Sequence, residues 1–349
     1  MYKNILFRTK YTIKTIVARL KEYLLAKNLD IDYDTSILFM LACDYNNIGD
    51  VFIRIAQEEY LKKIFPDKNI VTISYSDTYK YMKSIQRNST VNTIITLTGG
   101  GDTDDLYTGL EIARNTIIQR LKNSSCKIVG FPQTIDYSKT KRGNYYLKKT
   151  CRAYSNNPNF VFTAREKMSL ESARIFKKTK LILTPDIVMS LDYSNRHLKR
   201  SGIGMLLRSD EEKKLSAEFQ TEMIKQLKMN YEVSVNDMTV NQFDSSLLYQ
   251  YAEEKANYVL GKEVVITDRL HGMILCYITN TPCIVFKSSN HKITEVYKNW
   301  LKDNQNFVVL LETKDIDEVL GEIDRMKNIA CKKKDLTSSF MPLMDALIN

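Results

Sequence analysis

Short apolar runs alternate with longer amphipathic segments along most of the chain. Each run is rich in β-branched residues, and the segments between runs carry apolar residues at helical spacing. Such alternation is typical of βαβ units, in which helices join parallel strands. The runs predict strands at residues 37–43, 70–73, 91–97, 127–131, 160–163, 203–207, 231–235, 264–267, 283–286 and 307–311. One helix is predicted to follow the polar loop at residues 44–50 and to end at about residue 64. Further helices are predicted near 104–122, 143–155, 166–177, 211–229, 243–260 and 291–302.

The alternation lapses once, in a polar and basic stretch over residues 194–201, which we interpret as a linker. We therefore predict an α/β protein with two Rossmann-like domains facing a cleft. The N-terminal domain is predicted over residues 1–190, with 1–35 as a helical extension, and the C-terminal domain over 200–330. Residues 331–349 are predicted to form a C-terminal helical tail.

One helix, predicted over residues 10–27, has a distinct apolar stripe with basic residues on its other faces. A basic amphipathic helix can lie on an anionic lipid surface. It can also pack on its own domain, and we favour that interpretation. The stripe consists of Ile13, Ile16, Val17, Leu20 and Leu24.

Composition narrows the class of partner. The 349 residues include 44% hydrophobic and 26% charged residues, as in soluble globular proteins, and the net charge is +10. Such a charge favours nucleic acid, an anionic membrane surface or phosphorylated substrates. Basic residues are scattered, apart from Lys332-Lys333-Lys334, so we predict no nucleic-acid partner.

Cysteine and histidine positions suggest neither a zinc site nor a disulfide framework. The six cysteines form no CxxC pair, and the three histidines lie far apart in the sequence. The charged beginning of the sequence does not resemble a secretory signal, and no apolar run approaches the ~20 residues of a membrane span. We therefore predict a cytoplasmic location, with peripheral contact at the inner membrane face left open.

The stretch after the strand at 264–267 carries two cations at the start of a helix. Leu270 is expected to face the sheet, which places Arg269 and His271 about 100° to either side of it. A helix start carries partial positive charge, so these side chains are unfavourable there unless an anion neutralises them. The alternative is structural: an ion pair from Arg269 to Asp268 and a surface histidine with satisfied hydrogen bonds.

A glycine run follows the strand at 91–97 and precedes a predicted helix. Gly99, Gly100 and Gly101 would let the backbone approach a ligand closely and offer N–H groups to an anion, with Asp102 beside them. The run matches neither a dinucleotide fingerprint nor a Walker A loop, so nucleotide binding is not implied. The alternative is a turn that permits close packing of strand and helix.

Two further strand-to-helix junctions carry charged residues. Asp50 stands at the start of a helix, where it could cap the helix or accept a proton from a hydroxyl. Arg165 opens the helix after the strand at 160–163 and suits a carboxylate or phosphate. Its alternative role is an ion pair with Glu166 or Glu171.

In these motifs the sequence resembles the polysaccharide pyruvyl transferase family. The matches span about residues 40–290 in the expected order, and Gly272 departs from them, since alanine or serine is common at that position. The motif around Arg269 is the most specific. The matching residues are Asn47-Ile48-Gly49-Asp50, Gly99-Gly100-Gly101-Asp102, Phe162-Thr163-Ala164-Arg165-Glu166 with Ser169, Pro185-Asp186, and Thr267-Asp268-Arg269-Leu270-His271 with Thr281-Pro282.

The resemblance implies a glycosyltransferase-B-like fold and transfer of a pyruvyl group from phosphoenolpyruvate to a sugar, forming a ketal. His271 would then be an acid/base or phosphate ligand, Arg269 and Arg165 anion clamps, and Asp50 the base for the acceptor. No metal would be obligatory, since arginines can neutralise the leaving phosphate. The other residues expected to contact substrate are Asn47, Gly99, Gly100, Gly101, Asp102 and Asp268.

The expected partners are phosphoenolpyruvate and a sugar or lipid-linked oligosaccharide of a bacterial exopolysaccharide or cell-surface glycan. Two alternatives stay open. One is a glycosyltransferase of the same fold that uses a nucleotide sugar, for which we identify no nucleotide-binding residue. The other is a non-catalytic protein that binds a glycan or a lipid surface, against which the intact Arg269 and His271 argue.

Overall fold

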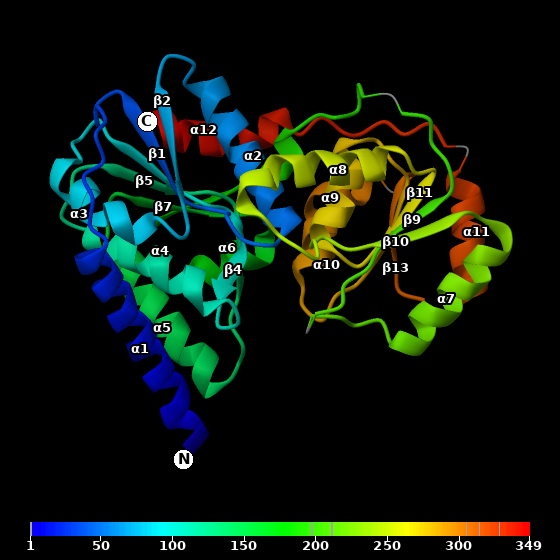
Figure 1. Ribbon diagram of the computed structural model, residues 1–349, viewed down its shortest axis with the longest axis horizontal. Coiled ribbons are helices and arrows are strands. Elements are labelled where there is room, and N and C mark those ends of the chain that lie inside the picture. Colours follow the sequence, from blue (N-terminus) through cyan, green and yellow to red (C-terminus); the bar gives the residue numbers. More distant parts are fainter. Residues whose placement is uncertain (1, 197, 211, 305, 314, 328) are drawn as a thin grey trace. The chain divides into compact units, whose positions relative to one another are not determined.

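The chain forms two compact units (Figure 1), seen in a computed structural model that describes residues 2–196, 198–210, 212–304, 306–313, 315–327 and 329–349. The first unit comprises Met1–Asp44, Ala56–Ile187 and Ser339–Asn349, and the second comprises Tyr45–Ile55 and Val188–Ser338. The units interleave along the sequence, whereas we predicted consecutive domains. The predicted domain boundaries and the shared cleft remain predictions.

The first unit is built on a parallel sheet in the order β2-β1-β3-β5-β7-β6-β4, with β8 also paired to β7. The predicted runs account for five of these strands, while β4, β6 and β8 were not predicted because they are short and partly polar. The strands are β1 (Ser36–Ala42), β2 (Asn69–Ser74), β3 (Ile94–Leu97), β4 (Gly100–Asp104), β5 (Lys127–Gly130), β6 (Gln133–Asp136), β7 (Phe160–Ala164) and β8 (Lys180–Leu183).

Helices connect and cover these strands. They are α1 (Tyr2–Leu24), α2 (Ile48–Ile64, whose first turns belong to the second unit), α3 (Thr78–Asn88), α4 (Thr108–Arg120), α5 (Lys141–Ser155), α6 (Lys167–Ala173) and α12 (Met341–Ile348). The segment of α3 was not predicted, and its sequence is mostly polar. Among the residues that the structure describes, no helix has both the length and the apolarity needed to cross a membrane.

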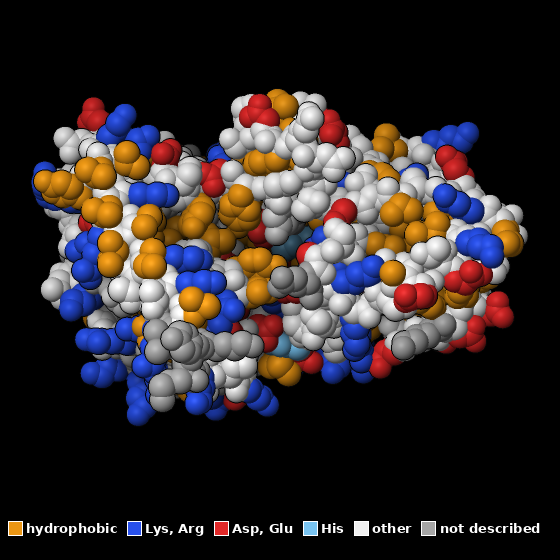
Figure 2. Space-filling model, turned by 60° about the horizontal axis from the view of Figure 1, so that its bottom comes forward, with side chains coloured by type: hydrophobic (Ala, Val, Ile, Leu, Met, Phe, Trp, Pro, Cys, Tyr) orange, Lys and Arg blue, Asp and Glu red, His pale blue; other side chains and the backbone are white. Residues whose placement is uncertain are grey.

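Helix α1 packs on its own unit, as we favoured, but the face that it buries is not its apolar stripe. It contacts α3, α4 and α5 through the side that carries Tyr11, Ala18 and Glu22. The predicted apolar stripe points away from the unit instead, and Leu20 is 51% exposed. Figure 2 shows hydrophobic side chains gathered in a band over this unit, with lysines and arginines along both borders.

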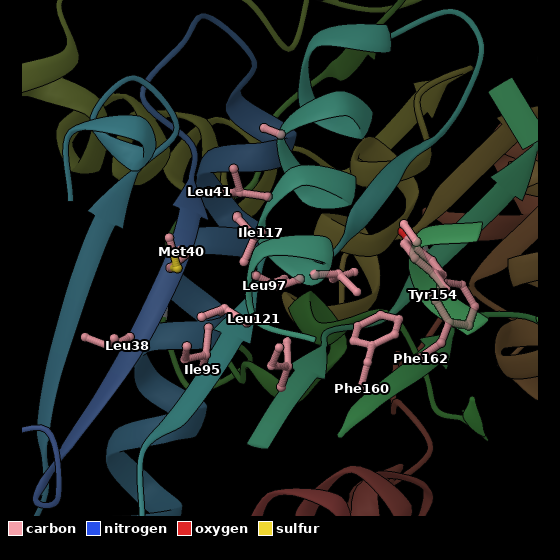
Figure 3. Close-up of a cluster of buried hydrophobic side chains, with 14 of the residues drawn as sticks. Leu38, Met40, Leu41, Ile95, Leu97, Ile117, Leu121, Tyr154, Phe160 and Phe162 are labelled. Carbon is pink, nitrogen blue, oxygen red and sulfur yellow. The ribbon is translucent and has the colours of Figure 1, made fainter. Parts of the chain in front are cut away.

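The core of the first unit lies around the central strands. Leu38 and Met40 of β1, Ile95 of β3, and Phe160 and Phe162 of β7 belong to one buried cluster (Figure 3). The runs that form β1, β3 and β7 are buried at every position. Continuous burial is typical of parallel strands covered by helices on both faces, which explains why these strands were visible in the sequence as unbroken apolar runs.

The second unit contains a smaller parallel sheet in the order β10-β9-β11-β12-β13. Strands β11 and β12 match the predicted residues, and the parallel sheets of both units confirm the predicted α/β, Rossmann-like class. The strands are β9 (Ile203–Leu206), β10 (Val233–Asn236), β11 (Val264–Thr267), β12 (Cys283–Phe286) and β13 (Val308–Leu311). The helices are α7 (Ala217–Asn230), α8 (Leu248–Leu260), α9 (Leu270–Ile278), α10 (Lys292–Val296, continued by a π-helix over Tyr297–Leu301) and α11 (Ile316–Met326). Short 3₁₀ turns occupy Ile187–Ser190, Ser245–Leu247, Lys302–Asn304 and Thr337–Phe340.

The strand order of the second unit reverses at one point. From β9 the chain adds β10 on one side of the sheet and β11 on the other, so the order reverses between β9 and β11. In open α/β sheets, ligands bind beyond the carboxyl ends of the strands at such a reversal. The segment that follows β11 begins with Asp268 and Arg269, so these two predicted site residues lie at the reversal.

Candidate active site

Two motifs far apart in the sequence touch at the starts of α2 and α9. Gly49 in the first turn of α2 lies directly against the ring of His271 in the first turn of α9. A Cβ atom at Gly49 would be 2.4 Å from His271 Nδ1 and 2.8 Å from its Cγ. Only glycine therefore permits this contact, which brings the Asn47–Asp50 and Asp268–His271 motifs together within the second unit.

The loop that follows β10 holds the start of α2 in place. The Asn46 side chain donates to the Val240 carbonyl at 2.7 Å and accepts from the Val240 N–H at 2.9 Å. The Ile48 N–H also donates to the carbonyl of Met238 at 2.8 Å. These bonds are independent of side-chain hydrophobicity, which is why the sequence pattern gave no sign of them.

Asn47 caps α2. Its side-chain oxygen accepts the N–H of Gly49 at 3.0 Å, a typical N-cap bond. The helix cap that we considered as an alternative role for Asp50 is therefore formed by Asn47. Asp50 is half-buried in the first turn, and its carboxylate accepts a hydrogen bond from the Tyr45 hydroxyl at 3.0 Å. This leaves Asp50 as a carboxylate next to the contact between Gly49 and His271.

Arg269 is the residue that precedes α9, and two carboxylates neutralise its charge. Its Nε and Nη2 donate to the two oxygens of Asp237, each at 2.8 Å, and Nη1 pairs with Asp210. The structural alternative had named Asp268 as the ion-pair partner of Arg269. Among the described residues its partners are Asp210 and Asp237 instead. The expected anion beside this cation is thus present, supplied by the protein itself.

Asp268 is a buried carboxyl group at the carboxyl end of β11. Its Oδ1 accepts the N–H of Arg208 at 2.8 Å, whereas Oδ2 has no hydrogen-bond partner among the described residues. Burial raises the pKa of Asp268 from 3.8 to about 6, although the nearby Arg208 and Arg269 act in the opposite direction. Asp268, at the carboxyl end of β11, therefore keeps its proton to a higher pH than an ordinary aspartate.

The glycine run lies in the first unit. We expected a helix directly after it, but a strand follows instead. Gly100 starts β4 at φ 132°, a conformation that favours glycine, and α4 begins only at Thr108. Asp102 lies within β4, where both carboxylate oxygens accept from Arg114 Nη2 at 2.9 and 3.0 Å. The helix predicted near 104–122 starts later than predicted, because the chain first continues into a strand that pairs with β6.

Arg165 is also engaged inside the first unit. Its Nη1 bonds to Asp186 at 2.8 Å and its Nε to the Thr134 hydroxyl at 2.6 Å, and the side chains of Arg165 and Asp186 are each 1% exposed. The structural alternative had named Glu166, whose carboxylate is 3.8 Å from Arg165 Nε. These bonds tie the ends of β7 and β8 together.

The second unit thus contains five of the ten predicted site residues, whereas Asp102 and Arg165 form buried ion pairs in the first unit. The substrate contacts predicted for Gly99, Gly100, Gly101, Asp102 and Arg165 stay predictions. Sequence reasoning missed Asp210 and Asp237, which lie beyond β9 and β10. An acidic residue directly after a short apolar run, as in Asn236-Asp237, was the signal that could have revealed Asp237.

Fold and site together define an α/β protein of two parallel-sheet units with a candidate site for an anionic ligand. A family model described as polysaccharide pyruvyl transferase matches residues 47–290, so the chain belongs to the polysaccharide pyruvyl transferase family. The resemblance seen in the sequence is confirmed, and with it the transferase class.

Relatives span most of the chain. General stress protein 30 of Bacillus subtilis (strain 168) is 32% identical over 304 residues, covering 86% of this chain and 88% of that protein. Pyruvyl transferase 1 of Schizosaccharomyces pombe is 26% identical over 278 residues, covering 74% of this chain and 68% of that protein. A crystal structure of a functionally uncharacterised Klebsiella pneumoniae protein has a TM-score of 0.56 at 17% identity, covers 80% of this chain and 94% of its own, and shares the fold.

Replacing Gly49 by alanine should disrupt the contact between the helix starts. The new Cβ would meet the His271 ring at 2.4 Å, and overpacking of this kind costs about 1–3 kcal/mol. Gly321 in α11 is the matched control, because a Cβ there meets nothing within 4 Å and alanine should stabilise the helix by up to about 1 kcal/mol. The midpoint of urea unfolding measures both, and equal midpoints for the two variants would contradict the contact.

Asp268→Asn should change how stability depends on pH. Between pH about 4 and about 6 the folded protein keeps the Asp268 proton while the unfolded chain releases it, so wild-type stability falls as pH rises. A pKa raised from 3.8 to about 6 corresponds to a penalty of about 3 kcal/mol above pH about 6. The variant should therefore gain stability relative to wild type at neutral pH and little at pH about 4. Urea unfolding at both pH values checks this, and a gain independent of pH would rule it out.

Proposed function

We propose that this protein transfers the pyruvyl group of phosphoenolpyruvate to a sugar of a bacterial exopolysaccharide or cell-surface glycan precursor, forming a ketal and releasing phosphate. The observation that carries the proposal is the contact of Gly49 with His271 at the starts of two helices, since Asp50 follows Gly49 in the first turn of α2. Family membership supports a pyruvyl transferase and a sugar acceptor.

The donor is an anion, and the site is suited to one. The starts of α2 and α9 both carry partial positive charge, and the contact between Gly49 and His271 holds them together. Phosphoenolpyruvate offers a phosphate and a carboxylate to such a site. The partial charges of the helix starts, together with the Nη1 donor of Arg269 once Asp210 is displaced, stabilise the leaving phosphate, so we propose that no metal is obligatory.

Arg269 has one partner that can be exchanged. Asp237 binds Nε and Nη2 on one edge of the Arg269 guanidinium, while Asp210 binds only Nη1 of Arg269, also pairs with Arg208 and is 38% exposed. We propose that the donor phosphate takes the place of Asp210 on Nη1, while Asp237 keeps the guanidinium plane fixed. Arg269 then acts as a clamp that is already oriented before the donor arrives.

The reaction needs one acid and one base. A proton from His271 adds to the methylene carbon of phosphoenolpyruvate, which becomes the methyl group, and a sugar hydroxyl attacks the neighbouring carbon. Loss of phosphate and attack by a second hydroxyl of the same sugar then close the ketal. The two hydroxyls release two protons, of which one restores His271 and the other leaves with phosphate or solvent.

Asp50 is placed to receive the proton of the attacking hydroxyl. Its carboxylate is half-buried and oriented by the Tyr45 hydroxyl at 3.0 Å, so it can act as a fixed base for the acceptor. A phosphate dianion bound beside His271 favours the protonated imidazole, which supplies the acid. We place this reaction in the cytoplasm, where phosphoenolpyruvate would be the donor and a free or lipid-linked glycan the acceptor.

His271→Gln should lose ketal formation by about 10²-fold or more, the usual contribution of a general acid, while donor binding is largely kept. The assay supplies phosphoenolpyruvate and a panel of sugars and measures ketal product together with released phosphate. Calorimetry with phosphoenolpyruvate provides the binding control. A thermal-shift comparison with nucleotide sugars addresses the glycosyltransferase alternative, because the true donor stabilises the folded protein.

Three outcomes would contradict these roles. Thermal stabilisation by a nucleotide sugar but not by phosphoenolpyruvate would show that phosphoenolpyruvate is not the donor. Retained ketal formation in His271→Gln would pass the proton to another group. Binding of glycans without any released phosphate would indicate a binding protein.

The two partners of Arg269 should differ in their effect on the donor. Asp237→Asn frees the guanidinium plane and should raise the KM for phosphoenolpyruvate about tenfold or more. Asp210→Asn weakens the contact that the donor phosphate displaces, together with the bonds between Asp210 and Arg208, and its KM should stay unchanged or fall. Steady-state kinetics on the same acceptor measures both variants, and equal increases in KM would refute the exchange.

A further inference from the structure

Helix α1 presents its most hydrophobic face to solvent. Ile13, Ile16, Leu20 and Leu24 lie on one side of the helix and are 54%, 51%, 51% and 72% exposed. A surface helix of a globular protein normally buries such a face and exposes the polar one. Contiguous exposed apolar surface marks a place where the protein meets another phase or partner.

The face that α1 does bury is unusually polar and aromatic. Glu22 is 4% exposed and pairs with Arg120 at 2.8 Å. Tyr11 makes edge-to-face contacts with Tyr145 and Tyr146, at centroid distances of 5.5 and 5.3 Å. These contacts anchor α1 on α4 and α5 with a fixed rotation, so the apolar stripe points outward as a feature of the fold.

Cations border the stripe on both sides. Arg19 and Lys21 lie about 100° to either side of Leu20, and Arg8 and Lys10 take similar positions about three turns earlier. All four side chains are exposed. An apolar stripe between two rows of Lys and Arg is the arrangement of helices that lie in the interface of an anionic bilayer.

A basic pocket opens beside the stripe. It has a volume of about 390 Å³ and lies between α1, α4 and α5; none of the described residues that line it is acidic, and Glu22 pairs with one of them, Arg120. Arg19 belongs both to this pocket and to the border of the stripe. The lining cations are Arg19, Arg120, Lys122, Lys149 and Arg152. Arginine and lysine donors of this kind suit a phosphate group.

We propose that α1 is a membrane-surface helix: its apolar stripe enters the lipid interface of an anionic bilayer, and the adjacent pocket holds the phosphate of a lipid headgroup. A second copy of this chain is a poorer occupant, because two stripes in contact would bring their basic borders together. A free phosphate would explain the pocket but not the stripe. The proposal is independent of the reaction assigned to the second unit.

The experiment is co-sedimentation of the full chain with vesicles of phosphatidylcholine mixed with phosphatidylglycerol, compared with vesicles of phosphatidylcholine alone. We expect binding to the anionic vesicles that weakens with added salt. The double variant Ile16→Ser/Leu20→Ser should weaken this binding at least tenfold, because it removes two apolar side chains from the interface. Arg152→Gln and Lys122→Gln should each weaken binding about fivefold to the anionic vesicles only.

Matched controls are taken from other surfaces of the protein. Met229 on α7 is 64% exposed, and the side chain of Arg174 is 69% exposed. Met229→Ser and Arg174→Gln should leave vesicle binding unchanged, and circular dichroism should show an intact fold for every variant.

Two outcomes would overturn the proposal. Binding of wild type to neither vesicle type, or to both equally, would refute an anionic membrane site. A dimer seen by analytical ultracentrifugation without lipid, and lost in Ile16→Ser/Leu20→Ser, would assign the stripe to a second copy.

Discussion

The ion pair between Arg269 and Asp237 fixes the geometry of the second unit's site. A cation at the start of α9 opposes the helix dipole, and Asp237 offsets that cost by binding the guanidinium through two 2.8 Å hydrogen bonds. The loop that carries Asp237 also holds α2, since the Met238 carbonyl accepts the Ile48 N–H at 2.8 Å. One short loop therefore positions both helix starts, and the packing of His271 against Gly49 follows from it.

The sequence predicted this region well where physical signals are local. Strands β11 and β12 are unbroken apolar runs, buried at every position, so their limits could be read directly. The dipole argument correctly indicated that Arg269 needs an anion. It could not supply Asp237, which is 32 residues away in a loop, because hydrogen bonds between loops leave no periodic pattern in a sequence.

Elsewhere the differences between prediction and structure have a common cause. The sequence pattern shows which residues a segment contains, but not which other segments pack against it. The stripe of α1 was visible, but the aromatic contacts of Tyr11 and the ion pair of Glu22 decide which face is buried. The glycine run was visible, but pairing of β4 with β6 made it a strand. Arg165 was recognised as a cation at a junction, yet its buried partner Asp186 is 21 residues away. Its motif therefore has a structural explanation that holds whether or not it contacts substrate.

The start of α2 completes a unit whose remaining residues come much later in the chain. Asn46 and Val240 are 194 residues apart, and they exchange two hydrogen bonds. During synthesis the Asn47–Asp50 segment must therefore wait until β10 and its loop have emerged from the ribosome. Contacts over such separations slow folding and prolong exposure of unpaired surface. A fragment limited to residues 188–338 would contain His271 without the helix start against which its ring packs, so the candidate site needs both separated parts of the chain.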